Sequence, residues 1–370
     1  MKKFLSLVLA LVMTMSLVTV SAGAKDFTDS SKINYAEAVD VLSEAKVIDG
    51  YADGAFNPSN TLTRGAAAKI ICNLILGPTA ASALVADAAP YKDVAANHPF
   101  AGYIAYCQKT GIISGYADGT FKPANSLTGY AFMKMLLGAL GYKADQEGYT
   151  GANWSINVAK RALNIGLADD LVGDFNGVKA VNREEACLYA FNTLKATMVE
   201  YDNRIVVGEG STAVAVSGVR KDLTWNKGTL NDGKIKKDGY VQFGEQYFEK
   251  LVRTDDTDDF GRPCVEWFWK ADSIGVYSNS DDLVATYTKK VTATDIYEAV
   301  GKSVSNAVKS GDAKCWITLD GKYIEAELNK VFSKDDTYTV NGTGNGDYTE
   351  VYVDGDNNVT CLLYTSDAAD

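Results

Sequence analysis

Two arginines follow residues that often cap helices, and this placement suits the binding of an anion. Arg64 comes directly after Thr63, and Arg183 comes directly after Asn182. The first turn of a helix has unpaired backbone N–H groups and a partial positive charge, and a guanidinium can donate two parallel hydrogen bonds to one carboxylate. An arginine at a helix start is also commonly a solvated surface residue. The spacing alone therefore leaves both roles open.

The composition excludes several other kinds of site. The net charge of -11 argues against nucleic acid and against an anionic membrane surface, because both need a basic patch. The single histidine, His98, precedes Pro99 and is expected at a helix entry, so zinc sites built on several histidines are excluded. Asp255–Asp259 suggests calcium, but Phe260 stands where an EF-hand loop needs glycine, which favours a solvated acidic loop. No nucleophile with a positioned base can be named, and we expect no cofactor.

A glycine-rich segment occurs twice in the first part of the chain. Gly50–Pro58 has the sequence GYADGAFNP, and Gly115–Pro123 has the sequence GYADGTFKP. The flanks repeat as well, since Phe27–Asp29 corresponds to Tyr91–Asp93. Such agreement indicates an internal duplication. The Asp-Gly step inside each copy predicts a tight turn with a positive φ at the glycine.

Each copy is expected to contain a helix, the glycine-rich turn and a second helix that begins at a capping residue. Apolar residues recur at i, i+3, i+4 and i+7 on both sides of the turn, which predicts amphipathic helices. Thr63 and Thr128 are the expected caps of the second helices. The predicted core faces are Tyr35, Ala38, Val39 and Leu42 with Ala67, Ile70, Ile71, Leu74 and Ile75 in the first copy, and Phe100, Tyr103, Ile104 and Cys107 with Phe132, Met135, Leu136, Ala139 and Leu140 in the second.

A third, eroded copy follows. Phe175 precedes Asn182 by the same spacing that separates Phe121 from Thr128, although the glycine-tyrosine turn is lost. Glu185 stands three residues after Asn182, which predicts a capping box in this copy alone. Three two-helix units can bury apolar faces that one unit cannot bury by itself. The core stripe expected in the third copy is Cys187, Ala190, Phe191 and Leu194.

The Phe-x-Asp opening, the Gly-Tyr-x-Asp-Gly-x-Phe-x-Pro turn and the Leu-Thr-Arg helix start together resemble the S-layer homology repeat. The resemblance covers about residues 25 to 200, closely in the first two copies and weakly in the third. It implies a mainly α-helical prism with three-fold symmetry. It also implies non-covalent binding of a secondary cell-wall polysaccharide, often one that carries negatively charged ketal-pyruvate groups.

The same resemblance assigns ligand residues. The arginine that the family places at the start of the second helix occurs as Arg64 in the first copy and Arg183 in the third, whereas Gly129 occupies this position in the second. For the two aspartates of the repeat openings, a role in orienting an arginine or binding sugar hydroxyls stands beside a structural role in a cap or turn. The predicted polysaccharide-binding set is completed by Asp29, Asp93, Gly50 and Gly115.

We expect an exported protein of several domains. Lys2 and Lys3 precede the apolar run Phe4–Val20, and Ala22–Ala24 offers a small-x-small site, which predicts a signal peptide cleaved after Ala24, with an uncleaved anchor as the alternative. Residues 361–370 resemble a translated sequencing adapter, which would make the natural protein longer and leaves Cys361 without structural meaning. The predicted boundaries are 1–24 for the signal peptide, 25–88, 89–150 and 151–200 for the repeats, 201–360 for a β-rich extracellular module and 361–370 for the artefact.

The six cysteines show no CxxC spacing and fall on apolar stripes or beside aromatic residues. Free cysteine behaves as a small apolar residue and is commonly buried. We therefore expect buried thiols. A bridged pair is the alternative, because exported chains can oxidise.

From about Tyr201 the sequence is typical of strands. Short alternating or β-branched runs, Asn-Gly and Asp-Gly turn signals and one helix near Asp295–Val308 predict an α+β or mostly β module. Trp267, Phe268 and Trp269 could form a sugar platform, but neighbouring strand residues face opposite sides, so at least one should lie in the core. The expected strands are Thr212–Val216, Val265–Trp269, Leu283–Thr288, Trp316–Leu319 and Tyr348–Val353.

Three classes of function remain open from the sequence. A wall-anchored structural or adhesive protein fits every visible feature. A wall-anchored carbohydrate-active or peptidoglycan hydrolase would need a catalytic part outside this chain, and an S-layer lattice subunit would assemble with S-layer neighbours. In each case the protein is secreted to the bacterial cell wall and is independent of the membrane after signal cleavage.

Overall fold

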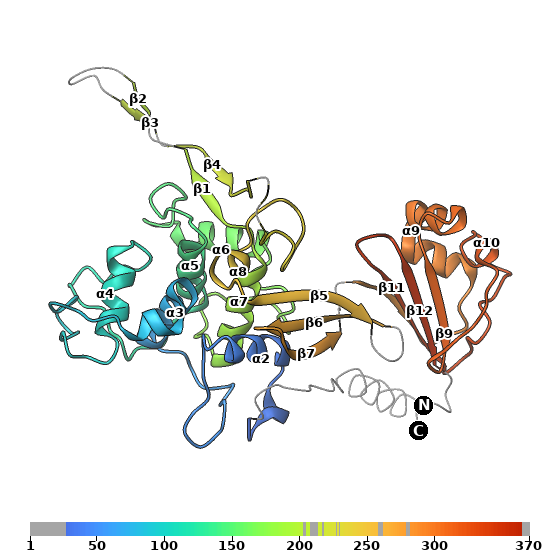
Figure 1. Ribbon diagram of the computed structural model, residues 1–370, viewed down its shortest axis with the longest axis horizontal. Coiled ribbons are helices and arrows are strands. Elements are labelled where there is room, and N and C mark those ends of the chain that lie inside the picture. The colour runs from blue at the N-terminus through green and yellow to red at the C-terminus, as the bar shows by residue number, and fades with distance from the viewer. Residues whose placement is uncertain are drawn as a thin grey trace. The chain divides into compact units, whose positions relative to one another are not determined.

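The computed structural model describes residues 27–202, 205–207, 214–216, 218–226, 228, 230–257, 262–278 and 282–364 (Figure 1). The chain divides into two compact units. One contains the residues up to Arg253 together with Phe268–Ile274, and the other contains Thr254–Trp267 and the residues from Gly275 on. Helices predominate in the N-terminal part and strands in the C-terminal part, as the sequence predicts. The predicted signal peptide lies outside the described residues.

Six α-helices of the N-terminal unit belong to the predicted repeats. Helix α2 pairs with α7, α3 pairs with α4, and α5 pairs with α6. The first helix of each copy thus packs against the second helix of the preceding copy, and the third copy precedes the first in this closed ring. A short 3-10 helix, η1 (Ser30–Lys32), comes before α2, and the six bounds are α2 Ala36–Glu44, α3 Arg64–Ser82, α4 Ala101–Lys109, α5 Gly129–Ala139, α6 Trp154–Asn164 and α7 Arg183–Lys195.

The second helix of each copy begins at the predicted cap. The Thr63 and Thr128 hydroxyls accept hydrogen bonds from the N–H groups of the third helical residues, at 3.2 and 3.4 Å. Asn182 accepts from the Glu185 N–H at 2.8 Å, and the Glu185 carboxylate accepts from the Asn182 N–H at 3.1 Å. The capping box predicted for the third copy is therefore confirmed.

A ring of backbone hydrogen bonds joins the three copies immediately before these caps. The Leu62 N–H donates to the Val181 carbonyl at 2.8 Å, the Val181 N–H donates to Leu127 at 2.9 Å, and the Leu127 N–H donates to Leu62 at 2.9 Å. Each of the three side chains is only 2% exposed. Because buried N–H groups need partners, this ring fixes the three helix starts relative to one another.

In the first two copies, the aspartate of the repeat opening holds the glycine-rich turn. The Asp29 carboxylate accepts from the Phe56 and Asn57 N–H groups at 2.7 and 2.8 Å, and Asp93 accepts from the Phe121 and Lys122 N–H groups at 2.7 Å each. Burial acts to raise the pKa of both carboxyls, but these N–H donors outweigh it and leave each pKa below its ordinary value of 3.8. The glycines of the Asp-Gly steps have the predicted positive φ, 82° at Gly54 and 81° at Gly119.

Short sheets follow the repeats. Strand β1 (Val199–Tyr201) pairs antiparallel with β4 (Arg220–Asp222), and β2 (Ile205–Val207) pairs with β3 (Val214–Val216). After helix α8 (Phe243–Tyr247), a three-stranded sheet has the order β5-β6-β7. Trp267 in this sheet is fully buried, which confirms that one of the three neighbouring aromatic residues lies in the core. The bounds are β5 Leu251–Thr257, β6 Pro263–Trp269 and β7 Asp272–Ser278.

The C-terminal unit is an α+β module. Its five-stranded sheet has the order β10-β9-β12-β11-β8, and all neighbours are antiparallel except the parallel pair β12 and β9. Helix α9 (Ala293–Ser310) packs on the sheet and covers the predicted helical stretch. Asp354–Asn358 forms the turn of the β11–β12 hairpin. The other bounds are β8 Leu283–Tyr287, β9 Cys315–Leu319, β10 Lys322–Tyr323, α10 Leu328–Val331, β11 Tyr348–Val353 and β12 Val359–Tyr364.

Two expectations about single segments need correction or completion. Cys361, which the sequence leaves without structural meaning, is 1% exposed in β12 and belongs to the core under α9. Residues 212–213, 258–260 and 365–370 carry parts of other predictions and lie outside the described residues. All six cysteines are free, and five are buried, with Cys315 half-buried. Burial raises the pKa of Cys187 and Cys315 to about 12, as expected for unreactive core thiols.

Leu127→Ala tests the ring between the copies. Removal of this buried side chain is expected to lower the free energy of unfolding of the helical unit by about 2–5 kcal/mol. Urea denaturation followed by far-UV circular dichroism measures the change. Leu230→Ala is the matched control, because Leu230 is 91% exposed and its loss should leave the transition in place. Equal midpoints for the two variants would contradict a packing role for the ring.

Asp29→Asn together with Asp93→Asn tests the turns. A carboxyl with a lowered folded pKa stabilises the fold above its unfolded pKa and loses that contribution as the pH falls through the folded value. The wild type should therefore lose stability below about pH 4, and the double variant should be less stable at pH 7 and less sensitive to acid. Thermal melting from pH 7 to pH 2 measures both. Parallel melting-temperature curves would show that these carboxyls do not hold the turns.

Candidate functional site

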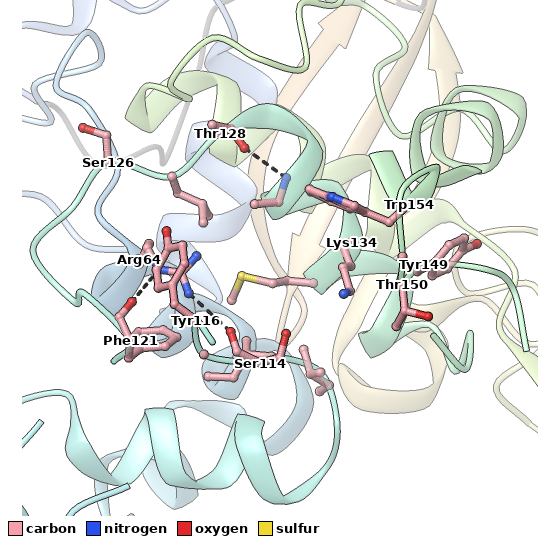
Figure 2. Close-up of a pocket in the computed structure, with 17 residues that line it drawn as sticks. Arg64, Ser114, Tyr116, Phe121, Ser126, Thr128, Lys134, Tyr149, Thr150 and Trp154 are labelled. Atoms are coloured by element: carbon pink, nitrogen blue, oxygen red, sulfur yellow. Dashed lines mark hydrogen bonds between the residues drawn. The ribbon is translucent and has the colours of Figure 1, made fainter. Parts of the chain in front are cut away.

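Arg64 begins helix α3 of the first copy, and its side chain serves the turn of the second copy. The Nε–H donates to the Phe121 carbonyl at 2.7 Å, and Nη2 lies 3.5 Å from the Ser114 carbonyl. The guanidinium carbon lies 4.4 Å from the ring centroid of Phe121 and 5.0 Å from that of Tyr116 (Figure 2). The aromatic faces and these two hydrogen bonds hold the guanidinium plane, while the Nη1 group has no hydrogen-bond partner among the described residues.

Arg183 repeats this arrangement between the third and first copies. Its Nε–H donates to the Phe56 carbonyl at 2.9 Å, and Nη2 donates to the Asp49 carbonyl at 2.8 Å. The guanidinium lies 4.7 Å from the ring centroids of both Tyr51 and Phe56. The two arginines therefore belong to equivalent inter-copy sites, each built from one helix start and the neighbouring aromatic turn.

The interface between the second and third copies has aromatic side chains instead of an arginine. Gly129 stands where the other two interfaces have arginine, and a Cβ there would lie 3.1 Å from the Gly177 Cα and 3.2 Å from the Phe175 ring. The following residue, Tyr130, packs edge-on against Phe175 and Trp154, at centroid distances of 5.9 and 6.4 Å. Aromatic packing thus takes the place that a guanidinium has in the other interfaces.

A cavity of about 460 Å³ opens beside Arg64, between the turn of the second copy, helix α5 and the segment that leads into α6 (Figure 2). This volume lies within the range of small-molecule sites. Among the described residues that line it, Arg64 and Lys134 carry charge and none is a carboxylate. Tyr116 and Trp154 contribute aromatic faces, and Thr150 contributes a hydroxyl.

Lys134 is a functional candidate that the sequence does not single out. It is half-buried on α5, and its amino nitrogen lies 5.5 Å from the Trp154 ring centroid. Burial lowers the pKa of this lysine. The sequence does contain one feature that could have pointed to this residue: Lys134 is a lone cation in the otherwise apolar run from Ala131 to Leu137. Its spacing alone gave no reason to connect it with Arg64 of another copy.

The remaining predicted ligand residues are placed as follows. Both Asp29 and Asp93 turn their carboxylates onto backbone N–H groups of their own copies, which favours the structural alternative for these two. Gly50 and Gly115 pack against the rings of Phe27 and Tyr91 with no room for a Cβ, and Gly115 also lines the cavity.

Other sites considered from the sequence are accounted for within the described residues. His98 accepts a hydrogen bond from the Phe100 N–H before α4, in agreement with a helix-entry role. Over the residues that the structure describes, no group of three or more His, Cys, Asp or Glu side chains is arranged to hold a metal ion. The same part of the chain contains no helix with the length and apolar character that a bilayer span requires.

Comparison with known proteins identifies the repeats. The S-layer homology domain matches residues 26–68 and 90–129, which are the first two copies. Its match does not extend to the third copy, whose assignment remains a prediction supported by the hydrogen bonds and helix pairing described above.

Several relatives resemble larger parts of the chain. A cell surface protein of Thermoanaerobacter kivui is 24% identical over 93% of this chain and 49% of its own length. A surface layer protein of Brevibacillus choshinensis is 29% identical over 45% of this chain and 15% of its own length. An uncharacterised cell wall amidase of Bacillus anthracis is 29% identical over 46% of this chain and 32% of its own length.

The chain spans about half the length of the first of these relatives and less than a third of the surface layer protein. The alignment with the Thermoanaerobacter kivui protein covers 93% of the chain and therefore includes most of the region of the helical repeats. With two S-layer homology matches and relatives named for the cell surface, the chain is an S-layer-homology-containing protein of the bacterial cell surface.

Proposed function

We propose that the three repeats anchor this protein to the cell wall by binding an anionic secondary cell-wall polysaccharide. The observation that carries the proposal is the cavity beside Arg64, where two cations face a space without any carboxylate among its described lining residues. A neutral sugar would gain little from two cations, whereas an acidic substituent would form charge-assisted hydrogen bonds with them. A ketal-pyruvate group, whose carboxylate suits the guanidinium fork, is the substituent we propose.

We further propose that the repeats form a prism with three-fold pseudosymmetry. The ring of hydrogen bonds among Leu62, Leu127 and Val181 supports this arrangement, because each residue plays the same part towards the next copy. The pairing of α2 with α7, α3 with α4 and α5 with α6 follows the same order. The symmetry would place three equivalent grooves around one axis.

The three grooves are not equivalent in chemistry. Arg64 lines the described cavity, and Arg183 has an equivalent stacked guanidinium with donors left free, so these two sites are the binding-competent ones in our proposal. The groove at Gly129 is occupied by Tyr130, Phe175 and Trp154. The protein would therefore bind polysaccharide through two sites rather than three.

Two other roles would use the same anchor. An S-layer lattice subunit would form ordered sheets, which electron microscopy of the purified protein detects. A wall-anchored hydrolase would need a catalytic part, for which the full-length gene is the decisive observation, and one relative named as a cell wall amidase gives this alternative its support. The role of the C-terminal α+β unit differs among these alternatives, whereas the proposed anchoring does not.

Arg64→Gln tests the binding role. Loss of a charge-assisted contact is expected to weaken binding to isolated wall polysaccharide about ten- to a hundredfold. Sedimentation with the polysaccharide, or calorimetric titration, measures the change. Lys69→Gln removes the same charge from an exposed position of the same helix and should leave binding unchanged. If Arg64→Gln and Lys69→Gln bind equally well, the assignment of Arg64 fails.

Gly129→Arg tests why the third groove differs. If a missing arginine were the sole difference, the substitution would add a binding site. We expect no gain, because the new side chain meets Gly177 and Phe175 at the Cβ, and we expect a loss of stability of about 1–3 kcal/mol. Stoichiometry from calorimetry and the urea midpoint report the two effects separately. A third binding event per chain would overturn this account of the groove.

A further inference from the structure

The cavity beside Arg64 extends to a second cation that the repeat pattern does not explain. Lys134 comes from helix α5 of the second copy, Thr150 lies at the end of that copy, and Trp154 begins the first helix of the third. Figure 2 shows Arg64 among the residues of the turn and the Lys134 amino group at the other side of the pocket, next to Thr150. The pocket therefore has two cationic ends, Arg64 from the first copy and Lys134 from the second.

The charge on Lys134 has no anionic partner within the described chain. No ion pair or hydrogen bond to a described residue involves its amino group, and burial is the one cause that shifts its pKa, with no contribution from a neighbouring charge. A half-buried cation without an anion costs stability. The same position would favour any anion that entered the pocket, because water screens the interaction poorly there.

The two cations lie on different sides of the pocket (Figure 2). The Arg64 guanidinium is held by its Nε hydrogen bond to the Phe121 carbonyl and by the rings of Phe121 and Tyr116. The Lys134 stem is half-buried on a helix and its amino group lies over Trp154. Each cation is thus tied to its own side of the cavity.

We propose that this pocket binds a glycan segment with two acidic substituents, one held by Arg64 and one by Lys134, with the sugar rings packed between Tyr116 and Trp154. The inference rests on the proposed function and specifies its ligand. The guanidinium fork suits a carboxylate, whereas the ammonium group is a compact charge that takes a carboxylate or a phosphate. Aromatic faces suit the apolar faces of sugar rings, and the Thr150 hydroxyl can bond a sugar hydroxyl.

The test is a double-mutant cycle on the full chain, with isolated wall polysaccharide as the probe and calorimetric titration as the readout. Lys134→Met removes the charge and keeps an apolar stem, and Lys69→Met on α3 is the matched control. We expect Arg64→Gln and Lys134→Met each to weaken binding about tenfold or more, and the double variant to weaken it by the product of the two factors. The salt dependence of binding should fall with each cation removed.

Treated polysaccharide identifies the second substituent. Hydrofluoric acid removes phosphate, and carbodiimide with borohydride reduces carboxylates. If the second substituent is a phosphate, hydrofluoric acid should weaken wild-type binding by the same factor as Lys134→Met and should leave the Lys134→Met variant unaffected. If it is a carboxylate, hydrofluoric acid should change nothing, and reduction should weaken wild-type binding by the product of the two factors, because it also removes the carboxylate held by Arg64. Thermal melting confirms that the variants are folded, and Lys134→Met is expected to melt no lower than the wild type, because the lysine has no ion pair to lose.

Each other outcome overturns the inference. A double variant that binds no more weakly than Arg64→Gln alone would show that both cations act on one anion. Binding by Lys134→Met equal to wild type, with Arg64→Gln impaired, would remove Lys134 from the site and leave the proposed anchoring in place. Failure of the wild type to bind the polysaccharide at all would end both the inference and the proposed function.

Discussion

The closed set of hydrogen bonds among Leu62, Leu127 and Val181 is the constraint on which the functional half of the molecule depends. These residues lie one position before the helix caps, so their pairing decides where each helix start lies relative to the neighbouring copy. Because the ring is cyclic, the start of each second helix faces the turn of another copy rather than its own. The chemistry of every groove is therefore shared between two segments that lie far apart in the sequence.

One geometry has produced two kinds of interface. The guanidiniums of Arg64 and Arg183 lie against aromatic turns and keep donors free, whereas Gly129 allows Tyr130 to close onto Phe175. The glycine is more than the loss of a ligand, because the Gly177 backbone lies only 3.1 Å from where a Cβ of residue 129 would stand. The third copy has lost the glycine-tyrosine turn, and the second copy has lost the arginine. Both losses therefore affect the same contact between these two copies.

Much of this could be predicted from the sequence, because the signals were local. Caps at Thr63, Thr128 and Asn182, positive φ in the Asp-Gly turns, and α9 with most of its neighbouring strands follow from residue types a few positions apart. Three features were not predictable from the sequence: the copy whose turn each arginine contacts, the strand order of the C-terminal sheet, and the position of Lys134 beside the Arg64 cavity. These depend on long-range closure, and no periodicity in the sequence records it.

Two proposed guanidinium sites on one folded unit would change what a weak site can achieve. If each guanidinium site binds the polysaccharide weakly, attachment through one site keeps the same polymer close to the other. A polymer bound at both sites then dissociates more slowly than a polymer bound at one. A repeating glycan supplies the second ligand without a new molecule having to arrive. The loss of the groove at Gly129 therefore need not weaken anchoring in proportion, since avidity requires only that Arg64 and Arg183 both remain available on the same folded ring.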